Sequence, residues 1–147
     1  MRAVVTRVKS ASVEIAGQRK AGIEQGFLIL LGIAPDDTEE TAVKLADKIC
    51  KTRVFEDEKG KMNLDLKTIG GEVLVVSQFT LYADLKGRRP SFLNAAKPVI
   101  AEPLYERFIQ ECQEQGFSVQ QGEFGADMQV SSVNDGPVTL LFDTVNM

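Results

Sequence analysis

Two hydroxyl side chains and an amide follow one of the most apolar stretches of the chain. Val73–Val76 is an uninterrupted aliphatic run, and Ser77, Gln78 and Thr80 come directly after it, with Phe79 between them. Such a short, mainly β-branched run is typical of a strand that is buried on both faces. Polar groups at its end must find partners, or each costs about 1–3 kcal/mol. Either the strand runs out into solvent, or its end forms a pocket where hydroxyls and backbone N–H groups face a ligand.

The chain contains no histidine, which restricts the chemistry of such a pocket. Serine–histidine and cysteine–histidine nucleophile pairs are excluded, and so are zinc sites that need histidine. Cys50 and Cys112 are far apart in sequence, which favours reduced, buried thiols over a disulfide framework or a metal knuckle. We therefore expect no metal and no cofactor. Catalysis would depend on carboxylates, hydroxyls, backbone dipoles or groups of the substrate.

The densest positive charge lies in Lys86-Gly87-Arg88-Arg89-Pro90, just beyond residues 77–80. A solvated loop and a phosphate-binding loop are both consistent with this composition. The formal net charge of −4 argues against a general nucleic-acid coat, which needs many phosphate contacts, but it allows one local basic patch. The acidic run Glu56–Glu58 lacks the alternating oxygen ligands of a calcium loop, so we interpret it as a solvated turn.

Asn134-Asp135-Gly136-Pro137 has the composition of a turn. Its simplest role is a tight connection between two strands. A second role follows from the chemistry of Gly136 and Pro137. X–Pro bonds are the only peptide bonds that become cis at modest cost, and a glycine without Cβ lets its carbonyl approach a ligand closely. Together the two residues could form a rigid main-chain probe.

The elements that position these residues are predicted from apolar periodicity and from turn and cap residues. We expect strands at Arg2–Val8, Ser12–Ala16, Arg19–Glu24, Phe27–Ile33, Arg53–Phe55, Met62–Leu66, Val73–Val76, Phe117–Gln121, Met128–Val133 and Val138–Phe142, and helices at Thr38–Lys51 and Pro98–Gln115. Because Pro103 suits a first turn, the regular part of the second helix is expected to begin near it. This order predicts an α+β fold: a mixed, curled β-sheet or barrel with two outer helices.

Length and composition predict one soluble domain. A chain of 147 residues fits a single domain over residues 1–147, and 44% hydrophobic and 26% charged residues are ordinary fractions for a globular protein. No apolar run approaches the ~20 residues of a membrane span. Met1–Lys9 lacks the apolar core of a signal peptide, so we expect a cytoplasmic protein without membrane contact.

Two motifs, Ser77-Gln78-Phe79-Thr80-Leu81 and Asn134-Asp135-Gly136-Pro137-Val138-Thr139, strongly resemble the signature motifs of the D-aminoacyl-tRNA deacylases. The stretches Lys61–Leu64, Arg89–Phe92 and Ala126–Val130 are similar to that family as well. Each motif alone is a weak signal, but both in this order and at this spacing are specific. The resemblance runs from Met1 to about Asp143.

The resemblance implies a homodimer that hydrolyses the ester between a D-amino acid and the 3′-terminal adenosine of tRNA. It also implies that the Gly136–Pro137 bond is cis and that this pair enters the active site of the other subunit. There it would screen the α-carbon of the substrate and reject L-amino acids. Glycine has no side chain to reject, so glycyl-tRNA mischarged on an alanine tRNA is implied as a second substrate.

Residues Ser77, Gln78, Phe79 and Thr80 are the predicted catalytic group. Backbone N–H groups near Phe79 and Thr80 would hold the developing oxyanion, and the side chains would position the ester and the adenosine. Thr80 could be the nucleophile, but no base neighbours it in sequence. We favour water, activated with help from the ribose 2′-OH. Phe79 either stacks on the adenine or belongs to the core.

The remaining predicted contacts bind the rest of the substrate. Gly136 and Pro137 would form the chiral screen with main-chain carbonyls, which yield less than side chains. Met128 either lines the amino-acid side of the pocket or only fills a gap. The candidates for acceptor-stem phosphates are Lys86, Arg88 and Arg89.

Two other functions remain open at this point. A nucleic-acid-binding relative without turnover would keep the fold, and a small-molecule esterase would cleave free D-amino-acid esters without RNA. Both motifs are intact and no basic tail extends the chain, which favours the tRNA-dependent enzyme.

Overall fold

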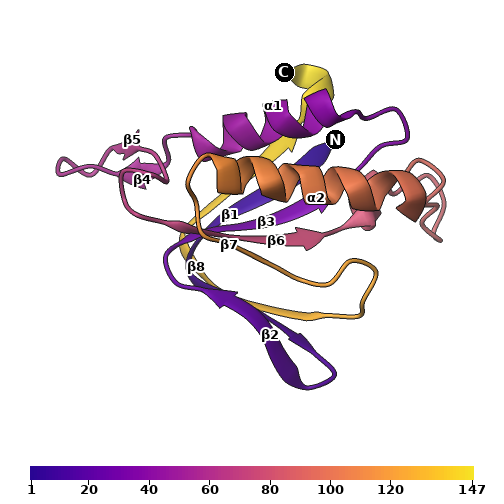
Figure 1. Ribbon diagram of the computed structural model, residues 1–147, viewed down its shortest axis with the longest axis horizontal. Coiled ribbons are helices and arrows are strands. Elements are labelled where there is room, and N and C mark those ends of the chain that lie inside the picture. Colours follow the sequence, from indigo (N-terminus) through magenta and orange to yellow (C-terminus); the bar gives the residue numbers. More distant parts are fainter.

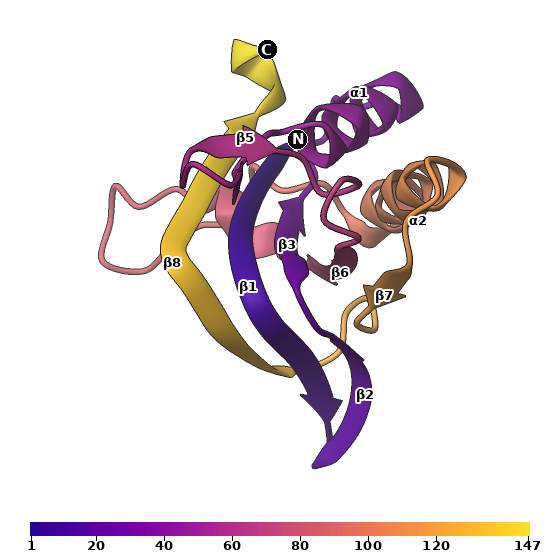
Figure 2. The same cartoon turned by 90° about the vertical axis from the view of Figure 1, so that its left-hand side faces the viewer.

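The structure is a computed structural model that describes residues 1–147. Two helices lie side by side on one face of a curled sheet (Figure 1, Figure 2). The elements are β1 Arg2–Ile15, β2 Gln18–Ile23, β3 Gly26–Gly32, α1 Glu39–Cys50, β4 Phe55–Glu56, β5 Met62–Leu64, β6 Glu72–Ser77, η1 Phe79–Tyr82, α2 Pro98–Glu114, β7 Val119–Gln121, β8 Gln129–Asp143 and η2 Thr144–Asn146. The expected α+β fold, with a mixed, curled sheet and two outer helices, is confirmed.

Strand β1 organises the sheet because it pairs with three other strands. The order is β2-β1-β3-β6-β7, and β8 pairs with the remaining edge of β1. All pairs that include β1 are antiparallel, whereas β3, β6 and β7 run parallel to one another. The first half of β1 lies between β8 and β3, and its second half lies between β8 and β2. The sheet bends along this long strand, as Figure 2 shows.

The curl explains the uninterrupted apolar runs of β3 and β6. Val73 and Val75 of β6 belong to a core of 24 buried residues that includes the inner faces of α1 and α2. The alternate residues, Leu74 and Val76, belong to a second cluster of 8 buried residues with side chains of β1 and β2. One face of the strand is covered by the helices and the other by the sheet itself. Val73–Val76 therefore forms a strand buried on both faces, as predicted.

Helix α1 begins and ends where its cap residues predict. Thr38 is the N-cap, its side chain accepts a hydrogen bond from the Thr41 amide, and the Thr41 side chain completes the capping box. At the other end, the Cys50 sulfur lies 3.8 Å from the sulfur of Cys112 in α2. Both thiols are free and buried, as expected. The contact with Cys50, together with burial, raises the pKa of Cys112.

Helix α2 begins at Pro98, where the predicted helix begins, but the expectation that its regular part begins only near Pro103 is wrong. Pro98 occupies the first turn, where its missing N–H leaves no helical hydrogen bond unmade. Pro103 lies inside the helix, and its missing N–H would have bonded the carbonyl of Val99. Val99 is 81% exposed, so water can reach that end of the helix. Neither helix has the length and apolar character that a bilayer-crossing helix requires.

The connection predicted at Asn134–Pro137 is also wrong, because the chain does not reverse there. Asn134 pairs with Val8 and Thr139 pairs with Thr6, so residues 135–138 bulge opposite a single residue of β1. Both flanks continue along β1 in one direction. Turn-forming residues signal a local departure from extended backbone, and here that departure is a bulge within one strand.

Other strand predictions differ mainly at their ends. Arg2–Val8 and Ser12–Ala16 are parts of the one strand β1. The two predicted strands near the C-terminus likewise form β8. The structure begins β4 at Phe55 and β7 at Val119, each two residues later than predicted.

We predict that Phe108→Ala lowers the free energy of unfolding by about 3–5 kcal/mol, because it removes a large side chain from a closely packed core. Phe108 is 0% exposed and packs between α2 and the sheet. Urea denaturation followed by circular dichroism measures the change.

The matched control is Val99→Ala, on the same helix but 81% exposed. It should change the free energy of unfolding by no more than about 0.5 kcal/mol. Equal effects of the two substitutions would contradict the packing of α2 described above.

Candidate functional site

A cavity of 530 Å³ opens at the carboxyl ends of the parallel strands β3 and β6. Its walls come from the end of β6, the first residue of η1, the N-terminal turn of α2 and the segment that leads into β8. Ligands of parallel sheets commonly bind outside the carboxyl ends of the strands. The strand end therefore forms a pocket for residues 77–79, whereas Thr80 is exposed to solvent.

Three members of the predicted catalytic group, Ser77, Gln78 and Phe79, line this cavity. Ser77 and Gln78 are half-buried. Phe79 is 53% exposed, so the alternative that it belongs to the core is wrong. Its ring meets that of Phe92 edge to face, with centroids 5.1 Å apart. Phe92 was not among the predicted site residues, although it falls in one of the stretches similar to the deacylases.

The backbone of this segment leaves the sheet in a defined way. The Gln78 amide donates to the Leu31 carbonyl at 2.8 Å, which extends the β3–β6 pairing by one hydrogen bond. The chain then turns as η1, with the Leu81 amide bonded to the Gln78 carbonyl at 3.2 Å. The amides of Phe79 and Thr80 are the first two of that helical turn and have no carbonyl within it to bind. They remain available to a ligand.

Thr80 is exposed and does not line the cavity. Its hydroxyl oxygen accepts a hydrogen bond from Nε2 of Gln78. An amide nitrogen that donates to the hydroxyl cannot also take the proton of that hydroxyl. The group next to Thr80 in space is therefore no general base.

Met128 lies in the cavity wall and also packs against the second core cluster, so it does more than fill a gap. A Cβ on Gly122 would lie 2.5 Å from the Met128 sulfur. The glycine therefore leaves the space in which the methionine packs.

Gly136 and Pro137 do not line this cavity. Their peptide bond is cis, as the resemblance implied, and Gly136 has φ +124°. The buried side chain of Arg7, which the sequence analysis missed, supports the bulge. Its Nε donates to the Asp135 carbonyl at 3.2 Å, and its Nη1 donates to the Val54 carbonyl at 2.6 Å. An arginine amid the apolar residues of β1 was the available signal.

The bulge and the cavity of one chain are far apart. Ser77 aligns with Leu31, which aligns with Ala3, whereas the bulge lies opposite Arg7. Ser77 and the bulge are therefore separated by four residues along β1 and by three strand spacings across the sheet. The diagonal path between them along the sheet is roughly 20 Å long. The two predicted halves of the site are not brought together within one chain.

The predicted phosphate-binding side chains lie on the exposed loop after η1. Lys86, Arg88 and Arg89 are all exposed, and none of them lines the cavity. The cation in the cavity wall is instead Lys97, which the sequence analysis did not select. Lys97 is the N-cap of α2, and a lysine before Pro98 carried no signal of a site.

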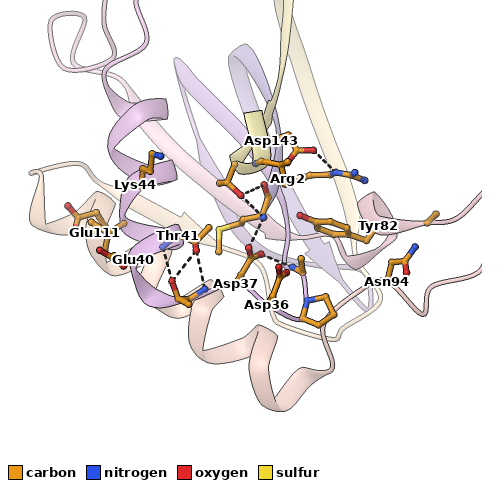
Figure 3. A pocket seen from close by; sticks show the side chains of 18 of the residues that line it. Arg2, Asp36, Asp37, Glu40, Thr41, Lys44, Tyr82, Asn94, Glu111 and Asp143 are labelled. Carbon is orange, nitrogen blue, oxygen red and sulfur yellow. Dashed lines mark hydrogen bonds and ion pairs between the residues drawn. The ribbon is translucent and has the colours of Figure 1, made fainter. Parts of the chain in front are cut away.

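A larger cleft of 1180 Å³ is lined by Tyr82 at the end of η1 and by the residues that follow it, Ala83 and Asp84 (Figure 3). Much of its charge is neutralised within the protein. Asp37 is 2.9 Å from the Met1 ammonium, and Asp143 is 3.0 Å from Nε of Arg2. No group of three or more histidine, cysteine, aspartate or glutamate side chains is arranged to hold a metal ion. We therefore assign the candidate site to the smaller cavity, which offers the Ser77 hydroxyl, backbone N–H groups, aromatic rings and one ammonium.

Known proteins resemble this chain over nearly its whole length. The family described as "D-Tyr-tRNA(Tyr) deacylase" matches residues 4–143. A protein of Thermosipho africanus named "D-aminoacyl-tRNA deacylase" is 57% identical over 145 residues, which cover 98% of this chain and 97% of the relative. A protein of the same name from Thermus aquaticus is 56% identical, with 98% and 95% covered.

Two solved structures share the fold. One is named "c-Myc DNA Unwinding Element Binding Protein"; it has a TM-score of 0.92 at 40% identity and covers 97% of this chain and 98% of its own. The other is described as a "probable eukaryotic D-amino acid tRNA deacylase"; it has a TM-score of 0.83 at 17% identity and covers 96% and 97%.

Proposed function

This chain belongs to the D-Tyr-tRNA(Tyr) deacylase family, and from this premise we propose how it hydrolyses the ester of a D-aminoacyl-tRNA. The activity is that of a D-aminoacyl-tRNA deacylase, a hydrolase. The observation that carries the proposed mechanism is the cavity at the end of β6, lined by Ser77, Gln78 and Phe79. In it the 3′-terminal aminoacyl-adenosine binds with its ester carbonyl toward η1.

The backbone provides the main electrostatic stabilisation of the reaction. An aminoacyl ester is already activated, so a protein without histidine can hydrolyse it. The free amides of Phe79 and Thr80 hold the developing oxyanion, and one such donor typically contributes about 3–4 kcal/mol. Ser77 and Gln78 orient the ester and the ribose, and Phe79 offers its exposed face to the adenine.

Water attacks the ester, with the ribose 2′-OH as its activating partner. The hydrogen bond from Gln78 to the Thr80 hydroxyl supports this choice, because it leaves Thr80 without a base. A threonine hydroxyl at its ordinary pKa is a weak nucleophile. The substrate therefore supplies, as its ribose 2′-OH, the activating group that the protein lacks.

The Gly136–Pro137 corner acts in the cavity of a second copy of the chain. Within one chain, its path of roughly 20 Å from Ser77 is too long for both to touch one substrate carbon. β8, which carries the corner, has only β1 as a paired neighbour and exposes Val133 and Leu141. An unpaired edge strand with exposed apolar side chains is a surface suited to a homodimer contact.

Main-chain carbonyls at this corner distinguish D- from L-amino acids by the configuration of the α-carbon alone. They bind the ammonium and the Cα–H of a D-amino acid and collide with the side chain of the L-form. Because the screen touches no D-side chain, many D-amino acids pass it. Glycine has no side chain to collide, so glycyl-tRNA mischarged on an alanine tRNA is a second substrate.

The rest of the tRNA meets positive charge around the cavity. Lys97 in its wall and Lys86, Arg88 and Arg89 on the neighbouring loop are the candidates for acceptor-stem phosphates. The reaction removes misacylated tRNA before translation uses it. We accordingly place this proofreading step in the cytoplasm.

A nucleic-acid-binding role without turnover is the second candidate. The 40% identical structure that is named for binding a DNA unwinding element favours it. The two candidates differ in the fate of an ester, so an activity measurement separates them.

We predict that the purified protein hydrolyses D-tyrosyl-tRNA at least about 100-fold faster than L-tyrosyl-tRNA, because L-side chains collide with the corner. A 2′-deoxy terminal adenosine should lower the D-rate by at least about 100-fold, because general base assistance typically contributes that much. Release of labelled tyrosine measures both rates, with buffer as the blank. If no ester, glycyl-tRNA included, is cleaved above the blank, the enzyme proposal fails. Equal rates with the 2′-deoxy substrate would favour a small-molecule esterase.

Thr80→Ala should keep at least about one tenth of the wild-type kcat, because water attacks the ester; removal of a true nucleophile costs about 10⁴-fold or more. Thr80→Ser, which keeps the hydroxyl, is the matched control. Single-turnover hydrolysis of D-tyrosyl-tRNA measures both variants. A folded, tRNA-binding Thr80→Ala protein without turnover, beside an active Thr80→Ser protein, would make Thr80 the nucleophile.

Gly136→Ala should narrow the ratio of D- to L-tyrosyl-tRNA hydrolysis by about tenfold, because the corner must move to admit the methyl group. The added Cβ would lie 2.9 Å from the Val138 amide nitrogen and 3.1 Å from Nη2 of Arg7, at φ +124°.

Gly60→Ala is the control for backbone strain. Gly60 also has a positive φ, +75°, but nothing lies within 4 Å of its added Cβ. Both variants should lose about 1–2 kcal/mol of stability, and only Gly136→Ala should lose selectivity. An unchanged D/L ratio in Gly136→Ala would remove the corner from the mechanism.

A further inference from the structure

Arg2, the first residue of β1, contacts the far side of the segment that forms the cavity wall. Its Nη1 donates to the Leu81 carbonyl at 3.0 Å, and its guanidinium carbon lies 4.5 Å from the centroid of the Tyr82 ring. Leu81 and Tyr82 are the last two residues of η1. Figure 3 shows Arg2 between Asp143 and Tyr82. One side chain therefore contacts both residues that end η1.

Gly32 supports the same segment from the sheet. It is the residue of β3 that pairs with Arg2. A Cβ on Gly32 would lie 3.0 Å from the Gln78 carbonyl oxygen and 3.0 Å from Cβ of Leu81. Such contacts are tighter than side chains normally make, so η1 rests directly on the backbone of β3. The glycine and the arginine hold η1 from two directions.

Asp143 is the ion-pair partner of Arg2. It pairs with Arg2 across β1 and β8, and its Oδ2 accepts a hydrogen bond from Nε of Arg2 at 3.0 Å. Burial alone would raise the pKa of Asp143, but hydrogen bonds from the Val145 amide and Arg2, together with the charge of Arg2, outweigh it and lower that pKa. The carboxylate is therefore ionised at neutral pH, and the pair weakens only on acidification.

η1 is a short 3₁₀ turn of four residues. At its ends, the Leu81 amide bonds the Gln78 carbonyl at 3.2 Å, and the Ala83 amide bonds the Thr80 carbonyl at 3.1 Å. Short 3₁₀ turns have poor hydrogen-bond geometry, so contacts from outside decide where they lie. Donors to an oxyanion need a hydrogen-bond distance to the transition state, not only to the ground state. A shift of η1 would therefore impair the chemical step more than binding.

We propose that Arg2, acting with Gly32, is a positioning residue for ester hydrolysis. It sets the position of η1 and, through it, of the Phe79 amide at the cavity and the Thr80 amide next to it. This inference rests on the proposed function, because those amides matter only if the ester binds beside them.

The test compares Arg2→Met and Arg2→Lys with the wild-type protein in hydrolysis of D-tyrosyl-tRNA. Arg2→Met should lower kcat about tenfold and change KM less than about twofold, the pattern of an interaction that acts on the transition state. Arg2→Lys keeps the charge beside Asp143 but lacks the planar fork that reaches Leu81 and covers Tyr82, so kcat should stay at least about fivefold low. Asp143→Asn leaves the Leu81 and Tyr82 contacts in place and should change kcat less than about threefold.

Hydrogen exchange at the Leu81 and Ala83 amides provides a readout that does not need activity. Exchange should become about tenfold faster in Arg2→Met and change little in Asp143→Asn. If Arg2→Met does not fold, Gly32→Ala perturbs η1 from β3 and should also lower kcat more than it raises KM.

Two results would overturn the inference. One is an active wild-type protein whose Arg2→Met variant keeps its kcat. The other is a loss of kcat that follows the loss of thermal stability while exchange at Leu81 and Ala83 stays the same, which would make Arg2 merely structural. A wild-type protein that hydrolyses no aminoacyl-tRNA would instead defeat the proposed function, and the exchange data would still report whether Arg2 holds η1.

Discussion

The parallel pairing of β3 with β6 is the interaction on which the site depends. The helices cover one face of this strand pair, and side chains of the curled sheet cover the other. The pairing continues to the hydrogen bond between the Gln78 amide and the Leu31 carbonyl. A strand held so firmly delivers its last residues to one place. The polar residues that follow then turn as η1 at the edge of a cavity instead of running into solvent. The precision of the site comes from the rigidity of the strand beneath it.

The same sheet separates the cavity from the Gly136–Pro137 corner. The bulge of β8 lies opposite Arg7 on an edge strand, whereas Ser77 at the cavity lies three strand spacings across the sheet and aligns with Ala3, near the start of β1. In our proposal, each active site is therefore built from residues of two chains. The Gly136–Pro137 corner that a second copy supplies can be stiff, because Arg7 of the same copy donates hydrogen bonds to the carbonyls of Asp135 and Val54.

The absence of histidine is consistent with a mechanism that relies on backbone and substrate. The polar side chains at the cavity include one hydroxyl, one amide and one ammonium, from Ser77, Gln78 and Lys97, and none of these is a strong base at neutral pH. For an activated ester, oriented N–H groups and a neighbouring ribose hydroxyl are sufficient in principle. The position of η1 then matters more for catalysis than the reactivity of any side chain. Residues that hold η1 in place, such as Arg2 and Gly32, are therefore as important to the proposed mechanism as those that line the cavity.

Local patterns in the sequence determined the elements and much of the cavity. The apolar runs, the Thr38 cap and the polar group at Ser77–Phe79 act through neighbours in the chain, so they could be identified without the fold. Only the tertiary structure decided the rest. Whether Asn134–Pro137 reverses the chain depends on what its flanks pair with, and the roles of Arg7, Lys97 and Arg2 depend on partners 20 or more residues away or on a cavity between elements. A residue's type and its near neighbours do not specify long-range contacts, because these arise from the packing of strands and helices that lie far apart in the sequence.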